Sequence, residues 1–244
     1  MAGNLASWLA SRPIAHRGLH DCNHLVWENT LSAFDAAIEG NFAIECDVRL
    51  TLDGVPVLFH DDQLKRLTGR EGLVHETRAE DLQAMTVGAT ADRVPTLDTM
   101  LARVAGRVPL VIELKGVEGF DGQLVAAVGQ RLASYDGPVA IMSFDHWLIR
   151  QFRTAAPGVP AGLTAMGTRP DQLEAHFSML AHDIDFTSFY VDQIDNPFVR
   201  MMRATLNRPV ITWTVRTPGQ VAATRALADQ MTFEGFDPDS MIQN

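Results

Sequence analysis

The chain has 244 residues, of which 46% are hydrophobic and 20% charged, a composition typical of a folded globular protein and not of a disordered one. Its formal net charge of −10 at pH 7 argues against a broad surface for nucleic acids or anionic lipids, because such a surface would need to be positive. An anionic substrate would have to be attracted by a few local positive charges or by a bound metal.

Short apolar runs alternate with segments of helical period along the chain. The predicted strands are Pro13–Ala15, Phe42–Leu50, Leu110–Leu114, Val139–Met142, Val159–Leu163, Phe186–Tyr190, Val210–Val215 and Met231–Phe233. The predicted helices are Thr30–Glu39, Asp121–Ser134, Asp145–Ala155, Pro170–Leu180, Asn196–Leu206 and Pro218–Ala228. This alternation favours a parallel sheet, and eight repeats favour its closure into a (β/α)8 TIM barrel, with an open doubly wound sheet as the alternative.

The interval from Thr51 to Arg107 is too long for one helical crossover. It begins with the turn signal Asp53-Gly54, which is followed by an apolar run from Val55 to Phe59. We interpret residues 51–107 as an insertion after the second strand, over the barrel mouth, where active-site loops lie. Residues 1–244 are otherwise predicted to form a single barrel domain.

The two cysteines, Cys22 and Cys46, are too few for a disulfide framework, and Cys46 lies in an apolar strand pattern where a reduced, buried thiol is expected. No basic segment followed by a continuous apolar stretch opens the chain, and no later run is long enough to cross a bilayer. We therefore expect a cytoplasmic protein with no stable membrane association.

Two carboxylates, Glu45 and Asp47, lie two residues apart in the second predicted strand. Because side chains alternate along a strand with a period of two, both carboxylates point to the same face. Unpaired buried carboxylates are costly unless a cation neutralises them, and a hard divalent metal is the natural partner. The pair therefore predicts a metal site.

A second pair with the same spacing, Glu113 and Lys115, ends the apolar run that begins at Leu110. Glu113 would complete a three-carboxylate site, and Lys115 would place positive charge where an anionic substrate meets the metal. A simple ion pair at a strand end is the alternative for these two residues alone. Two such pairs on neighbouring strands favour the metal site.

Two histidines lie where they would reach the barrel mouth. His16, Arg17 and Gly18 end the first strand, and the glycine permits a sharp exit with close approach of a ligand. His60 follows the predicted hairpin, which is short enough to keep it near the mouth. Two histidines near a metal supply the proton acceptor and donor that displacement at phosphorus needs near neutral pH. Taken alone, each is more often structural.

Three further residues have two interpretations. Trp213 alternates with Ile211 and Val215, so it is either barrel packing or pocket lining, and Phe144 has the same ambiguity. Asn29 precedes a helical segment, and we interpret it as a helix N-cap or first-turn residue rather than a ligand contact.

Together these residues resemble the glycerophosphodiester phosphodiesterase family. The shared motifs are Ala15-His16-Arg17-Gly18, Glu28-Asn29-Thr30, Glu45-Cys46-Asp47-Val48, Asp53-Gly54, His60-Asp61, Pro95-Thr96-Leu97, Ile112-Glu113-Leu114-Lys115, Ser143-Phe144 and Trp213-Thr214-Val215. Any single motif is weak, but the set covers nearly the whole chain in the family's order.

The resemblance implies a barrel with an insertion after the second strand, hydrolysis of glycerophosphodiesters to sn-glycerol 3-phosphate and an alcohol, and dependence on Ca²⁺ or Mg²⁺. It further implies a place in lipid and glycerol metabolism. It assigns Glu45, Asp47 and Glu113 to the metal, His16 and His60 to acid–base catalysis, Arg17 and Lys115 to the phosphate, and Phe144 and Trp213 to the pocket wall.

Two departures from the family pattern bear on the substrate's alcohol. The family usually has proline before Glu28-Asn29, where this chain has Trp27, and the terminal signature is replaced near residues 233–238. A small phosphodiester, not a nucleic acid, is the expected substrate.

Two other functions compete with this interpretation. One is a related barrel phosphodiesterase that acts on lysophospholipids or forms a cyclic phosphate. The other is a catalytically silent barrel that binds sugar phosphates. Two histidines beside a complete carboxylate set argue against the silent barrel, because binding needs charge but no proton donor and acceptor.

Overall fold

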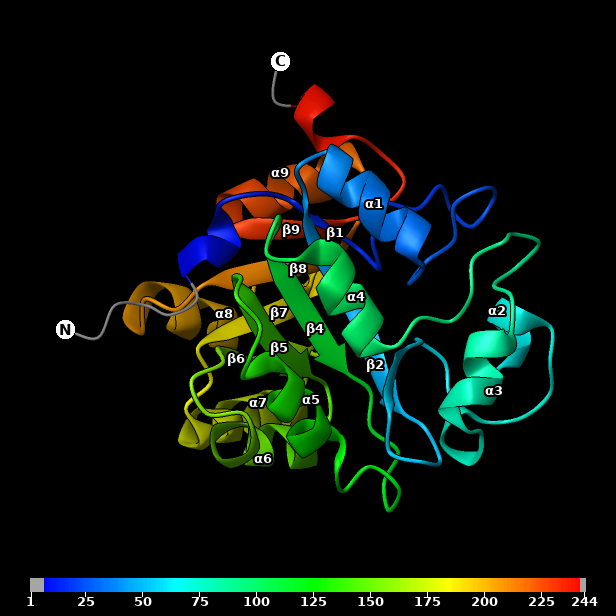
Figure 1. Ribbon diagram of the computed structural model, residues 1–244. Coiled ribbons are helices and arrows are strands. Elements are labelled where there is room, and N and C mark those ends of the chain that lie inside the picture. Colours follow the sequence, from blue (N-terminus) through cyan, green and yellow to red (C-terminus); the bar gives the residue numbers. More distant parts are fainter. Residues whose placement is uncertain (1–6, 242–244) are drawn as a thin grey trace.

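The computed structural model describes residues 7–241, and the chain forms a closed barrel of parallel strands surrounded by helices (Figure 1). The sheet order is β1-β9-β8-β7-β6-β5-β4-β2-β3, and an additional pairing of β1 with β2 closes the barrel. The strands are β1 Ile14–Ala15, β2 Ala43–Leu50, β3 Pro56–Leu58, β4 Leu110–Leu114, β5 Val139–Ser143, β6 Ala161–Ala165, β7 Phe186–Tyr190, β8 Val210–Val215 and β9 Gln230–Phe233. Among these strands of residues 7–241, only β3 is antiparallel to its neighbour, so it is a hairpin arm outside the barrel wall.

Helices connect the parallel strands. The α-helices are α1 Leu31–Glu39, α2 Lys65–Thr68, α3 Ala79–Ala84, α4 Leu97–Val104, α5 Leu124–Leu132, α6 His146–Ala155, α7 Pro170–Ser178, α8 Pro197–Arg200 and α9 Pro218–Leu227. Short 3₁₀ turns cover η1 Ser7–Ala10, η2 Val74–Glu76, η3 Met179–His182, η4 Val191–Gln193 and η6 Pro238–Met241, and η5, Met201–Thr205, is a π-helical turn. The segment predicted as one helix from Asn196 to Leu206 is therefore α8 followed by this π-helical turn.

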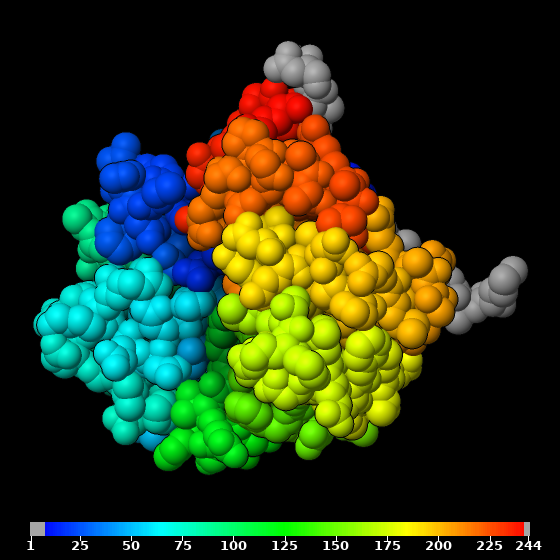
Figure 2. Space-filling model, turned by 180° about the vertical axis from the view of Figure 1, so that it is seen from behind, coloured from blue at the N-terminus to red at the C-terminus, as the bar shows by residue number. Residues whose placement is uncertain are grey.

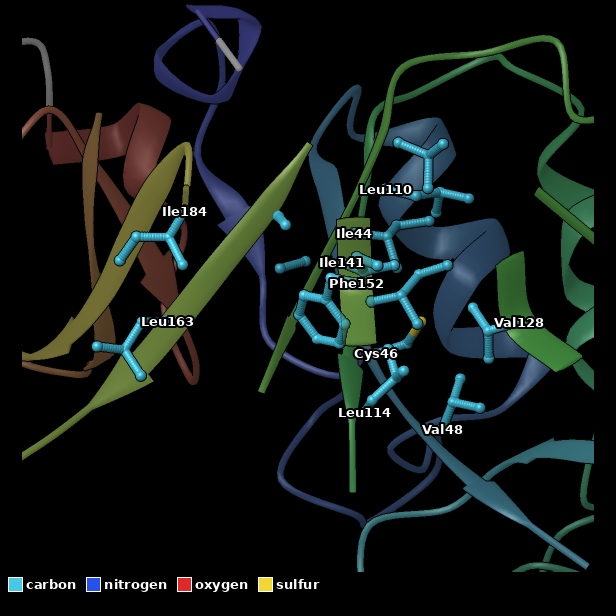
Figure 3. Close-up of a cluster of buried hydrophobic side chains, with 14 of the residues drawn as sticks. Ile44, Cys46, Val48, Leu110, Leu114, Val128, Ile141, Phe152, Leu163 and Ile184 are labelled. Carbon is cyan, nitrogen blue, oxygen red and sulfur yellow. The ribbon is translucent and has the colours of Figure 1, made fainter. Parts of the chain in front are cut away.

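Side chains alternate along β2 and β4 between the helix layer and the barrel interior. Ile44, Cys46 and Val48 belong to the main apolar core beneath the helices, together with residues such as Leu110 and Phe152 (Figure 3). The residues between them face the other way. This alternation is why β2 is buried along nearly its whole length although it carries two acids.

A separate apolar cluster fills the barrel interior at its amino-terminal end. It contains Ile14, Val111, Phe186 and Ile211, and Leu9 of η1 packs onto it. Because this end is filled with apolar side chains, polar chemistry is confined to the carboxyl ends of the strands, as in other parallel barrels.

The segment after β2 divides into two parts. Residues 51–96 include β3, α2, η2 and α3, and they enclose a small core of their own around Phe59 and Leu67. Figure 1 shows α2 and α3 beside the barrel, away from the ring of helices. The insertion ends earlier than the predicted range of residues 51–107. The reason is that α4 buries Leu97, Met100 and Val104 in the main core. Helix α4 is thus a barrel helix.

The indole of Trp27 connects the barrel to the insertion. It packs against the insertion core, and a Cβ added to Gly88 would lie 2.2 Å from its ring. Trp27 therefore serves as a packing contact between the loop after β1 and the insertion. Within residues 7–241, no helix combines the length and apolar character needed to span a membrane.

Candidate active site

The strand register brings the three predicted carboxylates together. In the parallel pairing of β2 with β4, Asp47 lies opposite Glu113, and Glu45 lies one interior position below. One oxygen from each of Glu45, Asp47 and Glu113 can be chosen so that all lie within 4.8 Å of one another. All three side chains are buried. The cluster therefore stands at the carboxyl end of the barrel interior, above the apolar plug.

The three acids experience different electrostatic environments. Burial, reinforced by the charges of Asp47 and Glu113, holds the pKa of Glu45 well above its usual range. Burial also raises the pKa of Glu113. For Asp47 the burial effect is outweighed by the charges of Lys115 and Arg17, so its pKa is lowered. Burial and repulsion thus disfavour the charged forms of Glu45 and Glu113, whereas the neighbouring cations favour the charged form of Asp47.

The cluster has the chemistry of a site for a hard cation. Oε1 of Glu45 is buried and has no hydrogen-bond partner within residues 7–241, whereas Oε2 accepts a hydrogen bond from the backbone N–H of Arg17 at 2.9 Å. Buried polar atoms are normally satisfied, so an unpaired oxygen on an acid that lies close to two other carboxylates fits coordination of a cation. Carboxylate oxygens are the ligands that Ca²⁺ and Mg²⁺ prefer.

Lys115 lies inside this cluster. Its Nζ is 2.7 Å from Oε1 of Glu113 and 3.3 Å from Oδ1 of Asp47. The same ammonium lies 5.6 Å from the ring centroid of Phe144, which makes an edge contact with Trp213 at 5.2 Å. Tyr190 extends this aromatic group, with its ring 5.3 Å from Trp213. The structure thus brings Lys115, Phe144 and Trp213 together beside the carboxylates.

His16 lies between two acids at the end of β1. Its Nδ1 is 2.9 Å from Oε2 of Glu234, and its Nε2 is 4.0 Å from Oε2 of Glu45. Burial lowers the pKa of His16 to about 4, even though the bond to Glu234 opposes this shift. The ring is therefore neutral near pH 7. When Nδ1 donates its hydrogen to Glu234, Nε2 is left as an acceptor on the side facing the carboxylates.

Arg17 and Gly18 turn the chain sharply over the site. Both residues have positive φ, 56° and 81°, and a Cβ on Gly18 would lie 2.8 Å from the Cβ of Ala33. The guanidinium of Arg17 donates from Nη1 to Glu28 at 2.7 Å, and its Nε is 3.3 Å from Oδ2 of Asp47. The predicted exit glycine is thus confirmed, and Arg17 lies against the carboxylate cluster.

Asn29 is neither a helix N-cap nor a first-turn residue, so the prediction from its position is wrong. Thr30 caps α1 by accepting from the N–H of Ala33, whereas Asn29 has a φ of 55° and faces the barrel. Its Nδ2 donates to Oδ2 of Asp47 at 2.9 Å, and its Oδ1 accepts from the backbone N–H of Asp47 at 3.1 Å. This reciprocal pair fixes the orientation of the Asp47 carboxylate.

His60 approaches from the insertion and not from the barrel wall. Its Nδ1 is 2.8 Å from Oδ1 of Asp61, and its carbonyl accepts a hydrogen bond from Nε of Arg49. The imidazole is close enough to Asp47 for its charge to help lower the pKa of that acid. In Figure 2 the cyan insertion borders a hollow that is also surrounded by the blue loop after β1 and by green and yellow segments.

A sequence profile described as the Glycerophosphoryl diester phosphodiesterase family matches residues 16–243. The chain belongs to this family. The putative glycerophosphodiester phosphodiesterase YhdW of Bacillus subtilis (strain 168) is 33% identical over 247 residues, covering 95% of this chain and 96% of the relative. A probable glycerophosphodiester phosphodiesterase 1 of Mycobacterium tuberculosis (strain ATCC 25618 / H37Rv) is 32% identical over 191 residues, with 68% of each chain covered.

Solved structures show that the family's barrel is shared. A phosphodiesterase of Oleispira antarctica, solved in complex with the product sn-glycerol-3-phosphate, superposes with a TM-score of 0.82 at 23% identity, covering 97% of this chain and 99% of that one. A putative glycerophosphoryl diester phosphodiesterase of Silicibacter pomeroyi gives 0.79 at 22% identity, with 95% and 94% covered. The predicted TIM-barrel fold is confirmed.

Some polar residues of this family member escaped prediction from the sequence. Glu234 follows β9 directly, and an acid at the end of a barrel strand was the signal that could have identified it. His20 lies beside His16 and Glu234, and both of its ring nitrogens are buried without a hydrogen-bond partner in the described part of the chain. Arg66 lies in the middle of the insertion, and nothing in its local sequence distinguishes it from the neighbouring Arg70.

Proposed function

We propose that this chain hydrolyses glycerophosphodiesters to sn-glycerol 3-phosphate and an alcohol, with a divalent cation and two histidines. One observation carries the proposal. A buried three-carboxylate cluster lies at the carboxyl end of the barrel, with His16 of the wall 4.0 Å from Glu45 and His60 of the insertion close enough to act on the charge of Asp47. The family membership and the product found in the Oleispira antarctica structure support it.

Glu45, Asp47 and Glu113 would hold Ca²⁺ or Mg²⁺. When bound, the cation supplies positive charge that offsets the developing negative charge on a phosphoryl oxygen. Lys115 and Arg17 are the cationic side chains placed against the cluster, and we assign them to the non-bridging oxygens of the phosphate. Binding of a phosphate between them would redistribute their present ion pairs with Asp47, Glu113 and Glu28.

The two histidines have matching hydrogen-bond arrangements. In each ring Nδ1 faces a carboxylate, Glu234 for His16 and Asp61 for His60, at 2.9 and 2.8 Å. A carboxylate at Nδ1 fixes the ring orientation and leaves Nε2 for proton transfer, the same logic by which an acid orients a catalytic histidine in hydrolases. One ring would accept the proton of the attacking water, and the other would protonate the departing alkoxide.

The aromatic residues beside Lys115 would border the organic part of the substrate. We assign Phe144 and Trp213 to this wall. A small diester needs only the local positive charge of this site, whereas a polymer would have to cross a strongly acidic protein surface. We accordingly propose small phosphodiesters as substrates. We also propose a cytoplasmic location and a place in lipid and glycerol metabolism.

Phosphorus NMR of the products tests the proposed reaction. Purified protein should be incubated with glycerophosphocholine in the presence of Ca²⁺ or Mg²⁺. We expect the diester signal to be replaced by that of sn-glycerol 3-phosphate. A cyclic phosphate would instead show internal displacement, and turnover of lysophosphatidylcholine alone would indicate the lysophospholipid alternative. No turnover with either metal would contradict the proposal.

A further inference from the structure

Arg66 is a residue of α2 that binds two acids with one guanidinium. Its Nη1 and Nη2 each donate to a different oxygen of Glu28 at 2.8 Å. Its Nε and Nη2 donate to the two oxygens of Asp61 at 2.7 and 2.9 Å. A planar guanidinium that makes two bidentate contacts is geometrically specific, and lysine cannot reproduce it.

The two acids lead to the two halves of the proposed site. Asp61 binds Nδ1 of His60 and thereby orients the imidazole. Arg66 in turn holds the carboxylate of Asp61 in place. Glu28 is buried in the loop after β1 and also accepts from Arg17. His60, Asp61, Arg66, Glu28 and Arg17 therefore form a continuous chain of charged contacts from the insertion to the barrel.

Glu28 gives this chain a fixed anchor on the barrel side. Asn23 donates to Glu28 from its side chain and accepts from the backbone N–H of Glu28, both at 2.7 Å. Hydrogen bonds and charges from Arg66 and Arg17 outweigh burial and lower the pKa of Glu28 to about 2. The acid is therefore ionised at neutral pH and held in place on the barrel side.

We infer that Arg66 is a positioning residue for His60: it fixes Asp61 against the barrel-anchored Glu28 and so aims the His60 imidazole at the barrel mouth. This inference rests on the proposed catalytic role of His60. Within residues 7–241, the guanidinium of Arg66 bonds to Glu28 and Asp61, and not to the carboxylate cluster or the aromatic wall. Through Asp61 it reaches His60, and through Glu28 it reaches Arg17; we assign its effect on kcat to the first of these routes.

A structural strap is the competing explanation, in which Arg66 only ties the insertion to the barrel. The insertion has other ties, because Trp27 packs against its core and Arg49 binds the carbonyl of His60. If Arg66 were only a strap, its loss would lower kcat by the same factor in the wild type and in His60→Ala. If Arg66 positions His60, its loss would lower kcat only in the protein that retains His60.

A double-mutant cycle separates the two explanations. The variants are Arg66→Gln, His60→Ala and the combination, with Arg66→Lys as a conservative variant. Arg70→Gln is the matched control, because Arg70 is an exposed arginine four positions further along the insertion. Steady-state kcat and KM with glycerophosphocholine and the thermal midpoint should be measured for each.

We expect Arg66→Gln to lower kcat about 10- to 100-fold with little change in KM, the range typical of residues that orient a ligating or catalytic side chain. Arg66→Lys should recover part of kcat, and Arg70→Gln should match the wild type. In the His60→Ala background, Arg66→Gln should change kcat less than about twofold.

The opposing results are distinct. If Arg66→Gln lowers kcat by the same factor with and without His60, or leaves kcat unchanged, the inference is wrong while the proposed function stands. If His60→Ala keeps wild-type kcat, both the catalytic role of His60 and the inference fail. Should Arg66→Gln not fold, the same comparison is made with Arg66→Lys in both backgrounds, and equal losses overturn the inference.

Discussion

The two halves of the candidate site are built by different means. In the barrel half, Glu45, Asp47 and Glu113 project from β2 and β4, and strand register fixes their spacing. In the insertion half, His60 projects from a loop and is held by ion pairs, with Arg66 still partly exposed. The first half depends on backbone hydrogen bonds that side-chain mutations do not remove. The second depends on particular side chains.

The buried charges of the site thus belong to the barrel half, and the orientation of His60 is set in the insertion half. Chemistry that requires buried charge is placed on the rigid wall, where the local dielectric strengthens its effect. In the proposed mechanism, proton transfer, which requires orientation, would be completed by His60 from a segment with its own small core. Mutations in the barrel half should therefore change metal binding and stability. Mutations in the insertion half should change turnover at nearly constant fold.

Removal of the cation should have the largest effect on activity. Exhaustive chelation should lower turnover by at least about 10³-fold, because a bound cation contributes several kcal/mol to stabilising the transition state. Added Ca²⁺ or Mg²⁺ should restore it. Turnover that persists after chelation, with metal content verified as nil by elemental analysis, would show that the carboxylate cluster has another role.

Overcrowding the contact between barrel and insertion should have the largest effect on stability. Gly88 has positive φ and lies against Trp27, so Gly88→Ala should cost about 1–3 kcal/mol of unfolding free energy for overpacking, beyond the backbone strain. Gly69→Ala is the control. Gly69 also has positive φ but no atom within 4 Å, so only the strain of about 1 kcal/mol remains. Equal urea midpoints for the two variants would contradict this packing.

Neutralising different acids of the cluster should have opposite effects on the metal-free protein. Asp47→Asn should lower the unfolding free energy by about 1.5–3 kcal/mol, because Asp47 accepts charged contacts from Lys115 and Arg17. Glu45→Gln should leave stability unchanged or raise it, since burial already disfavours the charged form. Thermal midpoints measured without metal check this. Equal destabilisation by both variants would show that repulsion is shared evenly.

Acid should weaken the barrel anchor of the insertion. The pKa of Glu28 falls from an ordinary value of 4.5 to about 2 on folding, so its contribution is complete above its unfolded pKa and is lost as pH falls through about 2. The size is on the order of 1 kcal/mol, because the partner Arg66 is half exposed and screened.

Urea unfolding of the wild type and Glu28→Gln between about pH 5 and pH 2 measures this contribution. The stability difference between them should shrink as pH falls. Glu71→Gln, in an exposed ion pair with Lys65, is the control. A difference that stays constant over the range would contradict the assignment.

Sequence pattern predicted the barrel half better than the insertion half. The period of two in β2 and β4 placed Glu45 with Asp47 and Glu113 with Lys115, because strand geometry alone determines which side chains share a face. It could not reveal that Asn29 would turn toward Asp47, since a helix cap and a site contact have the same local sequence. The end of the insertion near residue 96 was not predicted, because the sequence of α4 does not show which core its apolar face packs against.

The pairing of Arg66 with Glu28 lay beyond sequence reasoning for a related physical reason. The two residues are 38 positions apart, and neither lies on a barrel strand whose register would bring them together. Their contact depends on how the whole insertion docks. Glu234 and His16 differ in this respect. They are separated by 218 positions, but the parallel pairing of β1 with β9, in which Ala15 lies opposite Phe233, brings them together when the barrel closes.

The central claim is that a histidine from each half acts on the same phosphodiester, one as base and one as acid. Turnover of His16→Ala and His60→Ala should be compared on glycerophosphocholine and on a glycerophosphodiester with an activated leaving group. Each variant should lose about 10²- to 10⁴-fold in kcat on the natural diester with little change in KM. The activated substrate should rescue only one variant, the one that lacks the acid. Rescue of both, rescue of neither, or wild-type kcat in either variant on glycerophosphocholine would contradict the claim.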